Sequence, residues 1–375
     1  MDAASGPLCG LRVIEFAGIG PGPFACMLLA DMGADVVRID RPGAKPADPL
    51  DIVNRGRRTV LLDLKDARAV AQVFDLLEHA DALVEGFRPG VMERLGLGPE
   101  VVAARNPRLV YGRMTGWGQH GPLAEAAGHD INYISIAGAL AAVGEEGGPP
   151  VPPLNLVGDY GGGSLYLVMG LLAALLEAQR SGSGQVVDAA ICDGTLSLMS
   201  TNHSHTLRGL YREERGSNML DGGAPYYGTY ETADRLYVSL GPIEPKFFAL
   251  LCGQLELPKD LWDAQNDRSR WPELRASIAA AIRMRARADW CLRLEGTDVC
   301  FAPVLTLSEA ADHPHIRARA GFVEVEGVPY VAPAPRFSRT PSAIHPSTAS
   351  PVLAVDLLAG WRGVACKPIH DRRLA

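Results

Sequence analysis

The sequence predicts an α/β protein built around a mainly parallel, doubly wound sheet. Short apolar runs typical of strands alternate with stretches of helical periodicity along the first 200 residues, and this alternation is the pattern of parallel sheets with helical crossovers. The 375 residues are 47% hydrophobic, so the chain can form a large core, and its length suggests about two domains. The 41 glycines and 28 prolines indicate many turns.

Each element of the first domain follows from a local pattern. The expected strands are the apolar runs at 11–17, 35–40, 59–63, 82–85, 109–113 and 186–190. The expected helices cover 23–32, 66–79 and 159–181, and a further one begins near Asp193. The glycine-rich run at 18–22 predicts a tight turn between the first strand and the first helix. The helix over 159–181 falls short of the roughly 20 apolar residues of a membrane span, and we expect it to be buried.

A change of composition after about residue 200 indicates a domain boundary. Residues 218–230 are rich in Gly, Tyr and Pro, and a new strand is expected at 236–240. We therefore expect a large Rossmann-like domain over residues 1–200 and a smaller α+β domain over 225–325. The C-terminal segment, 326–375, is expected to return to the large domain through a helix.

Charge and cysteine content exclude several classes of function. The formal net charge of −7 argues against general binding of nucleic acid, which needs a basic face. The seven cysteines are odd in number and none shows C-x-x-C spacing, so we expect a reducing, cytoplasmic location. The N-terminus lacks the pattern of a signal peptide, and we expect no membrane partner. His203-x-His205 and His313-Pro-His315 lack further ligands at a recognisable spacing, so no metal site is expected.

The first strand-to-helix turn matches a dinucleotide-binding pattern. The match is Gly20-x-Gly22-x-x-Ala25, with Asp40 about 20 residues further on. That pattern works by directing backbone N–H groups at a pyrophosphate, and Pro21 and Pro23 have none to offer. We interpret the segment as a tight structural turn and keep a nicotinamide site as an alternative.

Two polar segments are candidates for a catalytic site. Gly128-His129-Asp130-Ile131-Asn132-Tyr133 is either reactive or the start of a helix capped by Asp130 or Asn132. Asp159 precedes an uncharged run, so it is expected at a helix N-terminus, as a cap or beside a developing anion. Three glycines follow at 161–163. Each destabilises a helix by about 0.5–1 kcal/mol relative to alanine, and we interpret them as room for a ligand.

A set of basic residues in the first domain suggests an anionic ligand. Any one of them could be ordinary surface charge, but most follow predicted strands, where ligands of parallel sheets bind. Together they predict a phosphate-bearing ligand at Arg41, Arg55, Arg57, Arg58, Lys65, Arg88 and Arg94.

Longer motifs resemble a known family. The segments 11–25, 30–42 and 86–90 resemble the class III CoA-transferase (CaiB/BaiF) family, and 128–133 together with 155–159 resembles its α-methylacyl-CoA racemase branch. The resemblance runs from about Leu8 to about Ser338 and places the chain in lipid metabolism. The tail after Thr348, with its basic run from Cys366 to Arg373, matches no part of the family that we can use.

The resemblance implies a role for individual residues. His129 and Asp159 match the two acid/base residues, and Glu244 matches the carboxylate that orients the histidine. Family members are interlocked homodimers, so Glu244 is expected to reach His129 of the other chain. The positions that match the CoA site are Arg41, Leu62, Asp63, Leu64, Lys65, Gly86, Phe87, Arg88, Arg94, Gly128, Asp130, Ile131, Asn132 and Tyr133.

The implied reaction is the epimerisation of 2-methylacyl-CoA thioesters through an enolate. Two groups must flank the α-carbon, one to remove its proton and one to return a proton on the other face. Since CoA is part of the substrate, no further cofactor is expected. The alternative within the family is CoA transfer, in which Asp159 attacks the thioester and forms a mixed anhydride. The pair of His129 and Glu244 favours the racemase, and a non-catalytic acyl-CoA-binding protein is a third hypothesis.

Overall fold

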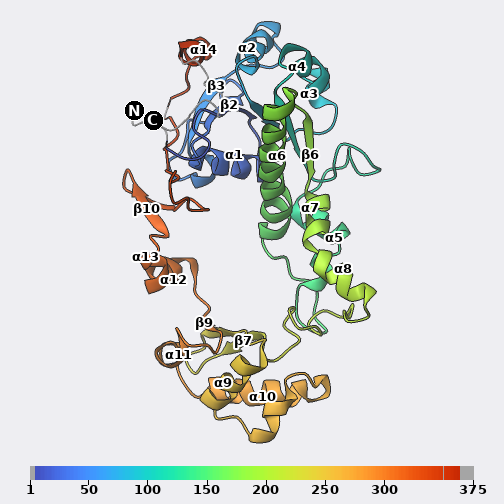
Figure 1. Cartoon of the computed structure of the whole chain (residues 1–375), viewed down its shortest axis with the longest axis vertical. Coiled ribbons are helices and arrows are strands. Elements are labelled where there is room, and N and C mark those ends of the chain that lie inside the picture. Colours follow the sequence, from blue (N-terminus) through green and yellow to red (C-terminus); the bar gives the residue numbers. More distant parts are fainter. Residues whose placement is uncertain (1–4, 349, 364–375) are drawn as a thin grey trace. The chain divides into compact units, whose positions relative to one another are not determined.

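The computed structural model describes residues 5–348 and 350–363 and forms two compact units (Figure 1). The first unit contains the described residues up to Ala137, Leu154–Met199 and those from Ala320 onward. The second unit contains Gly138–Pro153 and Ser200–Arg319. It differs from the expected range of 225–325 because its main segment runs from Ser200 to Arg319 and because it takes a loop, Gly138–Pro153, from within the first 200 residues. The basic run from Cys366 to Arg373 lies outside the described residues.

The first unit is built on a six-stranded sheet of order β3-β2-β1-β4-β5-β6, in which all neighbouring strands are parallel. Its strands are β1 (Arg12–Phe16), β2 (Asp35–Asp40), β3 (Arg57–Leu61), β4 (Ala82–Glu85), β5 (Val110–Thr115) and β6 (Val186–Ala190). The predicted parallel α/β sheet is confirmed. Strand β3 starts two residues before the expected run, because the side chain of Arg57 is buried in an ion pair with Glu15 and so occupies a core position.

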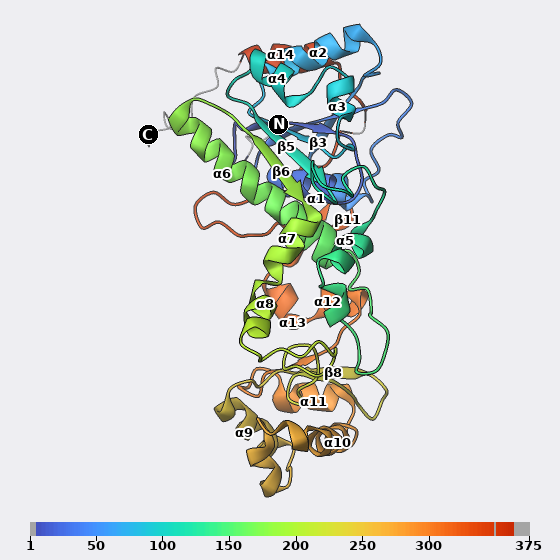
Figure 2. The same ribbon diagram turned by 90° about the vertical axis from the view of Figure 1, so that its right-hand side faces the viewer.

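Helices cover both faces of this sheet (Figure 2). On one face lie α1 (Pro21–Asp31) and α6 (Leu165–Ser181), which share a core with β1, β4 and β5. On the other face lie α2 (Ala67–Leu77), α4 (Pro99–Arg105) and α14 (Ala354–Gly363). Leu357 and Leu358 of α14 are buried in that second core, so the C-terminal segment packs on the large unit.

The connections set the position of the site. The chain runs from β1 to β2 and β3 on one side and then returns to β4 on the other side of β1. The strand order therefore reverses between β1 and β4, and ligands of open α/β sheets bind at the carboxyl ends of the strands at such a reversal.

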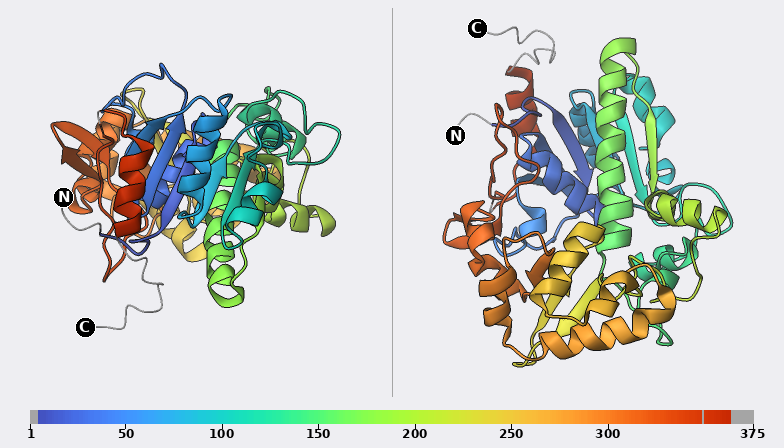
Figure 3. Two further views of the ribbon diagram at one scale, coloured as in Figure 1. Left: turned by 90° about the horizontal axis from the view of Figure 1, so that it is seen from above. Right: turned by 60° about the horizontal axis from the view of Figure 1, so that its bottom comes forward.

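Helix α6 continues a segment of π-helical turns, Leu156–Ser164, that precedes it. The joint helix, Leu156–Ser181, is long and apolar enough to cross a membrane by length and composition alone, and 44% of its apolar window is buried. It lies along the sheet near β6 (Figure 3). Its inner face carries Leu167 and Leu171, whereas Leu165 and Met169 are exposed. The prediction of a buried helix therefore holds for one face only.

The second unit combines a small sheet with helices, as predicted. Strands β7 (Gly228–Glu231), β8 (Tyr237–Leu240) and β9 (Phe301–Pro303) form an antiparallel sheet in that order. The helices α9 (Pro245–Gln254), α10 (Trp271–Ile282) and α11 (Arg287–Leu294) pack on it around Phe248, Leu274 and Trp290.

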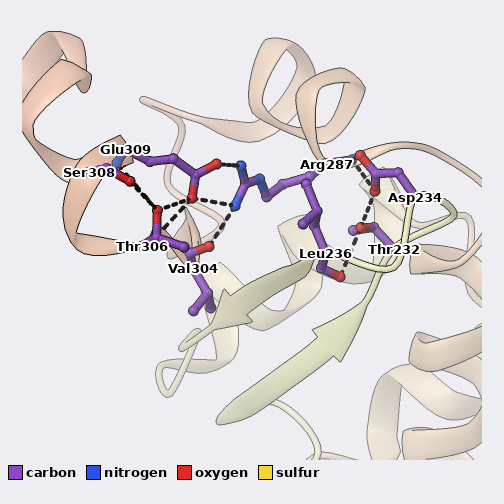
Figure 4. Close-up of polar contacts among 8 residues, drawn as sticks. All are labelled: Thr232, Asp234, Leu236, Arg287, Val304, Thr306, Ser308 and Glu309. Carbon is purple, nitrogen blue, oxygen red and sulfur yellow. Dashed lines mark hydrogen bonds and ion pairs between the residues drawn. The ribbon is translucent and has the colours of Figure 1, made fainter.

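Arg287 ties the helices of the second unit to its sheet (Figure 4). Its backbone N–H donates to the carboxylate of Asp234 at 3.1 Å, and its Nη1 donates to the carbonyl oxygen of Val304 at 2.7 Å. The guanidinium also pairs with Glu309 of α12 (Leu307–Asp312), which in turn accepts from the backbone N–H of Thr306 at 2.8 Å. One side chain therefore joins α11, α12 and Val304, the residue that follows β9.

The remaining elements are shorter. They are α3 (Val91–Arg94), α5 (Asp130–Ile136), α7 (Ile191–Leu198), α8 (Ser200–Leu207), α13 (Pro314–Ala318), the hairpin strands β10 (Phe322–Val325) and β11 (Val328–Val331), and the short 3₁₀ helices Ile52–Asn54, Leu140–Ala142, Lys259–Ala264 and Arg268–Arg270.

Candidate active site

The turn between β1 and α1 forms one wall of the candidate site. Gly20 is the residue before α1 and has a φ of 69°, a backbone conformation that favours glycine. A Cβ atom at Gly20 would lie 3.2 Å from Oδ2 of Asp159, so the glycine leaves space for that carboxylate. Because Pro21 and Pro23 stand in the first turn of α1, two of the first three residues of this helix have no N–H to offer a pyrophosphate. The geometry favours the structural turn over the nicotinamide site.

Asp159 lies in the first turn of the π-helical segment and is half-buried. Its backbone N–H donates to Oδ2 of Asp130 at 2.7 Å. The carbonyl oxygen of Asp159 accepts from the hydroxyl of Ser164 at 3.0 Å. The same hydroxyl lies 2.7 Å from the carbonyl oxygen of Pro21, to which it also donates. The backbone of Asp159 is thus held from two sides, while its carboxylate faces Gly20.

His129 stands directly before α5 and is exposed. Its backbone N–H donates to Oδ1 of Asn132 at 3.0 Å, so Asn132 stabilises this helix start. Asp130 does not cap the helix, because its carboxylate points to Asp159 instead. The segment is therefore both a helix start and part of the site, and the imidazole of His129 remains accessible.

The surroundings of Asp159 raise the pKa of its carboxyl group. Burial is the largest cause, and the charge of Asp130 acts in the same direction. A hydrogen bond from the side chain of Asn155 and the charge of His129 lower the pKa and offset part of this rise. A carboxyl group whose pKa is moved toward neutrality is better matched to acid/base chemistry. Asn155 was not predicted as a site residue, although it stands in the same motif as Asp159.

Tyr133 forms the wall next to these groups. Its ring lies against Gly116 and Gly128, and a Cβ atom at Gly128 would come within 2.8 Å of the ring. The hydroxyl donates to the carbonyl oxygen of Gly128, and Trp117 packs edge-on at 4.7 Å between ring centroids. Burial, the charge of Asp159 and the thiol of Cys192 raise the pKa of Tyr133, whereas Arg88 lowers it. Tyr133 is thus a buried neighbour of Asp159.

The glycines at 161–163 pack against protein rather than leave room for a ligand. A Cβ atom at Gly162 would lie 2.7 Å from Oγ1 of Thr195, and one at Gly163 would lie 3.1 Å from the side chain of Ile191. One at Gly161 would lie 3.0 Å from the carbonyl oxygen of Leu156. The expectation that these glycines admit the substrate is wrong, since their small size lets the helix approach α7.

Three of the seven basic residues are structural, which corrects the prediction for them. Each forms an ion pair with a carboxylate of the first unit, and the first two pairs are almost fully buried. The pairs are Arg55 with Asp31, Arg57 with Glu15, and Arg58 with Asp35. These arginines hold β3 and the turn before it against α1, β1 and β2.

The other four basic residues remain candidates for an anion site. Arg41, Lys65 and Arg88 follow the carboxyl ends of β2, β3 and β4, and Arg94 ends α3. All four are exposed, and within residues 5–348 and 350–363 none forms an ion pair. They place positive charge along the edge of the sheet where the strand order reverses.

Other residues expected at the CoA site take different positions. Leu62 belongs to the core, and Phe87 packs against Phe16 at 6.3 Å between ring centroids. Leu64 is partly buried against the same core, whereas Gly86, Ile131 and Asp63 are exposed. The carboxylate of Asp63 accepts from the backbone N–H of Lys65 at 3.0 Å. Leu62 and Phe87 therefore anchor the loops whose exposed residues could meet a ligand.

Glu244 belongs to the second unit. It follows β8, stands directly before α9 and is exposed, and its carboxylate makes no capping hydrogen bond. Its charge raises the pKa of the Cys300 thiol, after the larger effect of burial.

Comparison with known proteins matches these observations. The model of CoA-transferase family III matches residues 8–356. The chain belongs to CoA-transferase family III. As a member of this family it resembles two curated relatives, the alpha-methylacyl-CoA racemases of Mus musculus and Homo sapiens. They are 45% and 43% identical over 336 residues, which cover 89% of this chain and 87% of each relative.

The solved structures agree with the family assignment. A CaiB/BaiF family protein from Brucella suis matches with a TM-score of 0.81 at 26% identity, covering 95% of this chain and 100% of that one. The predicted membership of family III and the resemblance to its racemase branch are both confirmed.

Proposed function

We propose that this family III protein is an isomerase that epimerises 2-methylacyl-CoA thioesters by moving a proton at the α-carbon. The observation that carries the proposal is the half-buried Asp159, whose pKa is raised, beside the start of α5 where His129 is exposed. The 45% identity to a protein named alpha-methylacyl-CoA racemase supports the same reaction.

In the proposed reaction two acid/base groups exchange protons with the α-carbon from opposite faces. One of His129 and Asp159 removes the α-proton, and the electron pair of the broken C–H bond moves into the thioester and forms an enolate. The other group returns a proton to the opposite face. The reaction needs no oxidant and no metal, and CoA enters and leaves as part of the substrate.

The developing enolate needs hydrogen-bond donors. The N–H of Asp159 donates to Asp130, so this particular group at the helix start does not serve as the donor. The first two N–H groups of α5, at Asp130 and Ile131, have no acceptor within their helix. They follow His129 directly in the chain, and we propose them as donors to the thioester oxygen.

We propose that Arg41, Lys65, Arg88 and Arg94 hold the phosphates of CoA. Their exposure and their lack of ion pairs in the described chain leave these charges available. Guanidinium groups bind phosphate through paired, charge-assisted hydrogen bonds, which suits three of the four positions.

We further propose a cytoplasmic homodimer whose active site takes Glu244 from the partner subunit. Glu244 is exposed and unused by the cap of α9, so its carboxylate is available to orient a histidine. Apolar side chains on the outer face of α6 and on α7, such as Leu165, Met169 and Leu198, are exposed in the single chain. Burial of such a surface is a main source of dimer stability.

Isotope exchange tests the proposed reaction. One enantiomer of a 2-methylacyl-CoA is incubated in deuterium oxide without a free carboxylic acid. Loss of optical purity together with α-deuterium uptake supports the racemase, and Asp159→Ala and His129→Ala should each abolish it. If CoA moves only after a free acid is added, the protein is a CoA-transferase and the proposal is wrong.

A further inference from the structure

We propose that Asp130 is a positioning residue for Asp159, acting through a hydrogen bond to its backbone and through a second negative charge beside its carboxylate. This inference rests on the proposed function, in which Asp159 is an acid/base group. It concerns how the chain prepares Asp159 for that role, rather than a contact with the substrate.

The geometry fixes Asp130 against the turn that carries Asp159. Asp130 begins α5, is only 8% exposed, and accepts the N–H of Asp159 at 2.7 Å through Oδ2. Gly158 makes this approach possible, because a Cβ atom there would overlap the Asp130 carboxylate and lie 2.9 Å from Ile134. Two segments 29 residues apart in the chain are thereby joined at the reacting group.

The hydrogen bond to the Asp159 backbone does not by itself require a charged carboxylate at Asp130. Its Oδ1 is buried and has no hydrogen-bond partner among the described residues. An asparagine could accept the same N–H through one oxygen, without placing a charge in a buried position, which is costly. The feature that only an aspartate supplies here is the negative charge, and that charge lies next to Asp159.

The charge has a defined effect among the groups around Asp159. The pKa of Asp159 is raised by Asp130 and lowered by His129 and Asn155. Tyr133 of α5 also lies near Asp159. Arg88, in the loop after β4, and Cys192 of α7 lie near Tyr133 in turn. Two neighbouring carboxyl groups resist being ionised together. Asp130 therefore favours the protonated form of Asp159, which is the form that can return a proton to the substrate.

The test replaces the charge and keeps the bond. Asp130→Asn is nearly isosteric and retains an oxygen acceptor for the Asp159 N–H. Asp81→Asn is the matched control, because Oδ2 of Asp81 accepts the backbone N–H of Arg12 at 2.8 Å next to the amino end of β4, on the opposite edge of the sheet. The titration of Asp159 is followed by carbon-13 NMR of aspartate-labelled full-length protein, with its signal identified by its loss in Asp159→Asn.

In Asp130→Asn the midpoint of the Asp159 titration should fall to lower pH, because the neighbouring negative charge is removed. The limb of the pH–rate profile for deuterium exchange that belongs to Asp159 should move with it. In Asp81→Asn both should stay at the wild-type values. An unchanged Asp159 midpoint in folded Asp130→Asn overturns the inference.

A second variant reaches the same contact from the other side. Gly158→Ala keeps the charge but displaces the Asp130 carboxylate, and it should lower both the exchange rate and the Asp159 midpoint. Unchanged values for both in Gly158→Ala also overturn the inference. If the wild type shows no exchange, the proposed function fails, and the NMR titration still decides the role of Asp130.

Discussion

Gly194 allows the closest backbone contact beside the candidate site, and Gly194→Ala probes it. A Cβ atom at Gly194 of α7 would overlap the carbonyl oxygen of Gly162 and lie 2.9 Å from its Cα. Backbone atoms cannot rotate away as a side chain can, so the two helical segments must separate. Because Gly162 is three residues after Asp159, the separation also disturbs the position of that carboxylate.

The expected loss of stability follows from two opposing effects. Replacing a helical glycine by alanine contributes about 1 kcal/mol of stability through helix propensity. Overpacking in a close contact costs about 1–3 kcal/mol, and a clash with rigid backbone lies at the upper end of that range. We expect Gly194→Ala to lower the free energy of unfolding by about 2 kcal/mol. A displacement of about 1 Å at Asp159 can reduce kcat by about 100-fold.

The control is Gly360→Ala, which changes a helical glycine of α14 with no atom within 4 Å of its Cβ position. It should gain up to about 1 kcal/mol. Thermal and urea unfolding, followed by circular dichroism, give the two stabilities, and deuterium exchange gives kcat and KM. If Gly194→Ala is as stable as Gly360→Ala and changes only KM, the contact serves ligand access and the packing argument is wrong.

Three further predictions concern the site shared between subunits, the arginines proposed to bind phosphate, and the buried carboxyl group of Glu85. A heterodimer co-expressed from Asp159→Ala and Glu244→Ala chains should regain about half of the wild-type activity, because one of its two shared sites is complete; a heterodimer as inactive as each parent would place the whole site within one chain. Arg41→Ala and Arg94→Ala should each raise KM for the acyl-CoA by about three- to tenfold and leave kcat unchanged; a fall in kcat at constant KM would contradict the phosphate role. Burial raises the pKa of Glu85 from 4.5 to about 7, against the N–H of Phe87 and the charge of Arg113. The folded state therefore binds the proton more tightly, so the contribution of Glu85 to stability is complete below pH 4.5 and is lost as the pH rises through 7. The midpoint of urea unfolding of Glu85→Gln, relative to that of the wild type, should rise over that pH interval. A difference that stays constant with pH would refute the raised pKa of Glu85.

The strands of the first unit could be predicted because their signal is local. Runs such as Asp35–Asp40 and Ala82–Glu85 are centred on apolar residues, and their expected bounds agree with the observed ones. The largest shift at the start of a strand is in β3, whose first residue is Arg57. Its partner Glu15 lies 42 residues away, and no local pattern shows that an arginine will be neutralised and buried by so distant a residue.

The same limit explains the errors in the candidate site. The sequence groups Arg55 and Arg58 with the phosphate-binding residues because it shows only their neighbours along the chain, whereas their carboxylate partners belong to other elements. Gly162 suggests space for a ligand because a glycine in a sequence shows that another group comes close, but not which group. In the fold that neighbour is α7. In the sequence Asp130 is one of four polar residues in the segment 128–133, and its bond to Asp159 depends on the tertiary structure.

The way this chain is suited to an anionic ligand follows from its first turn. In the strand order seen here, a dinucleotide is held by the free N–H groups at the start of the first helix. That helix start carries Pro21 and Pro23, and its Gly20 faces the carboxylate of Asp159 instead. Positive charge for a phosphate must then come from exposed side chains such as Arg41 and Arg88. Exposed charges are screened by salt, whereas the half-buried Asp159 is screened much less. In the proposed reaction, rising ionic strength should therefore raise KM and leave kcat nearly constant.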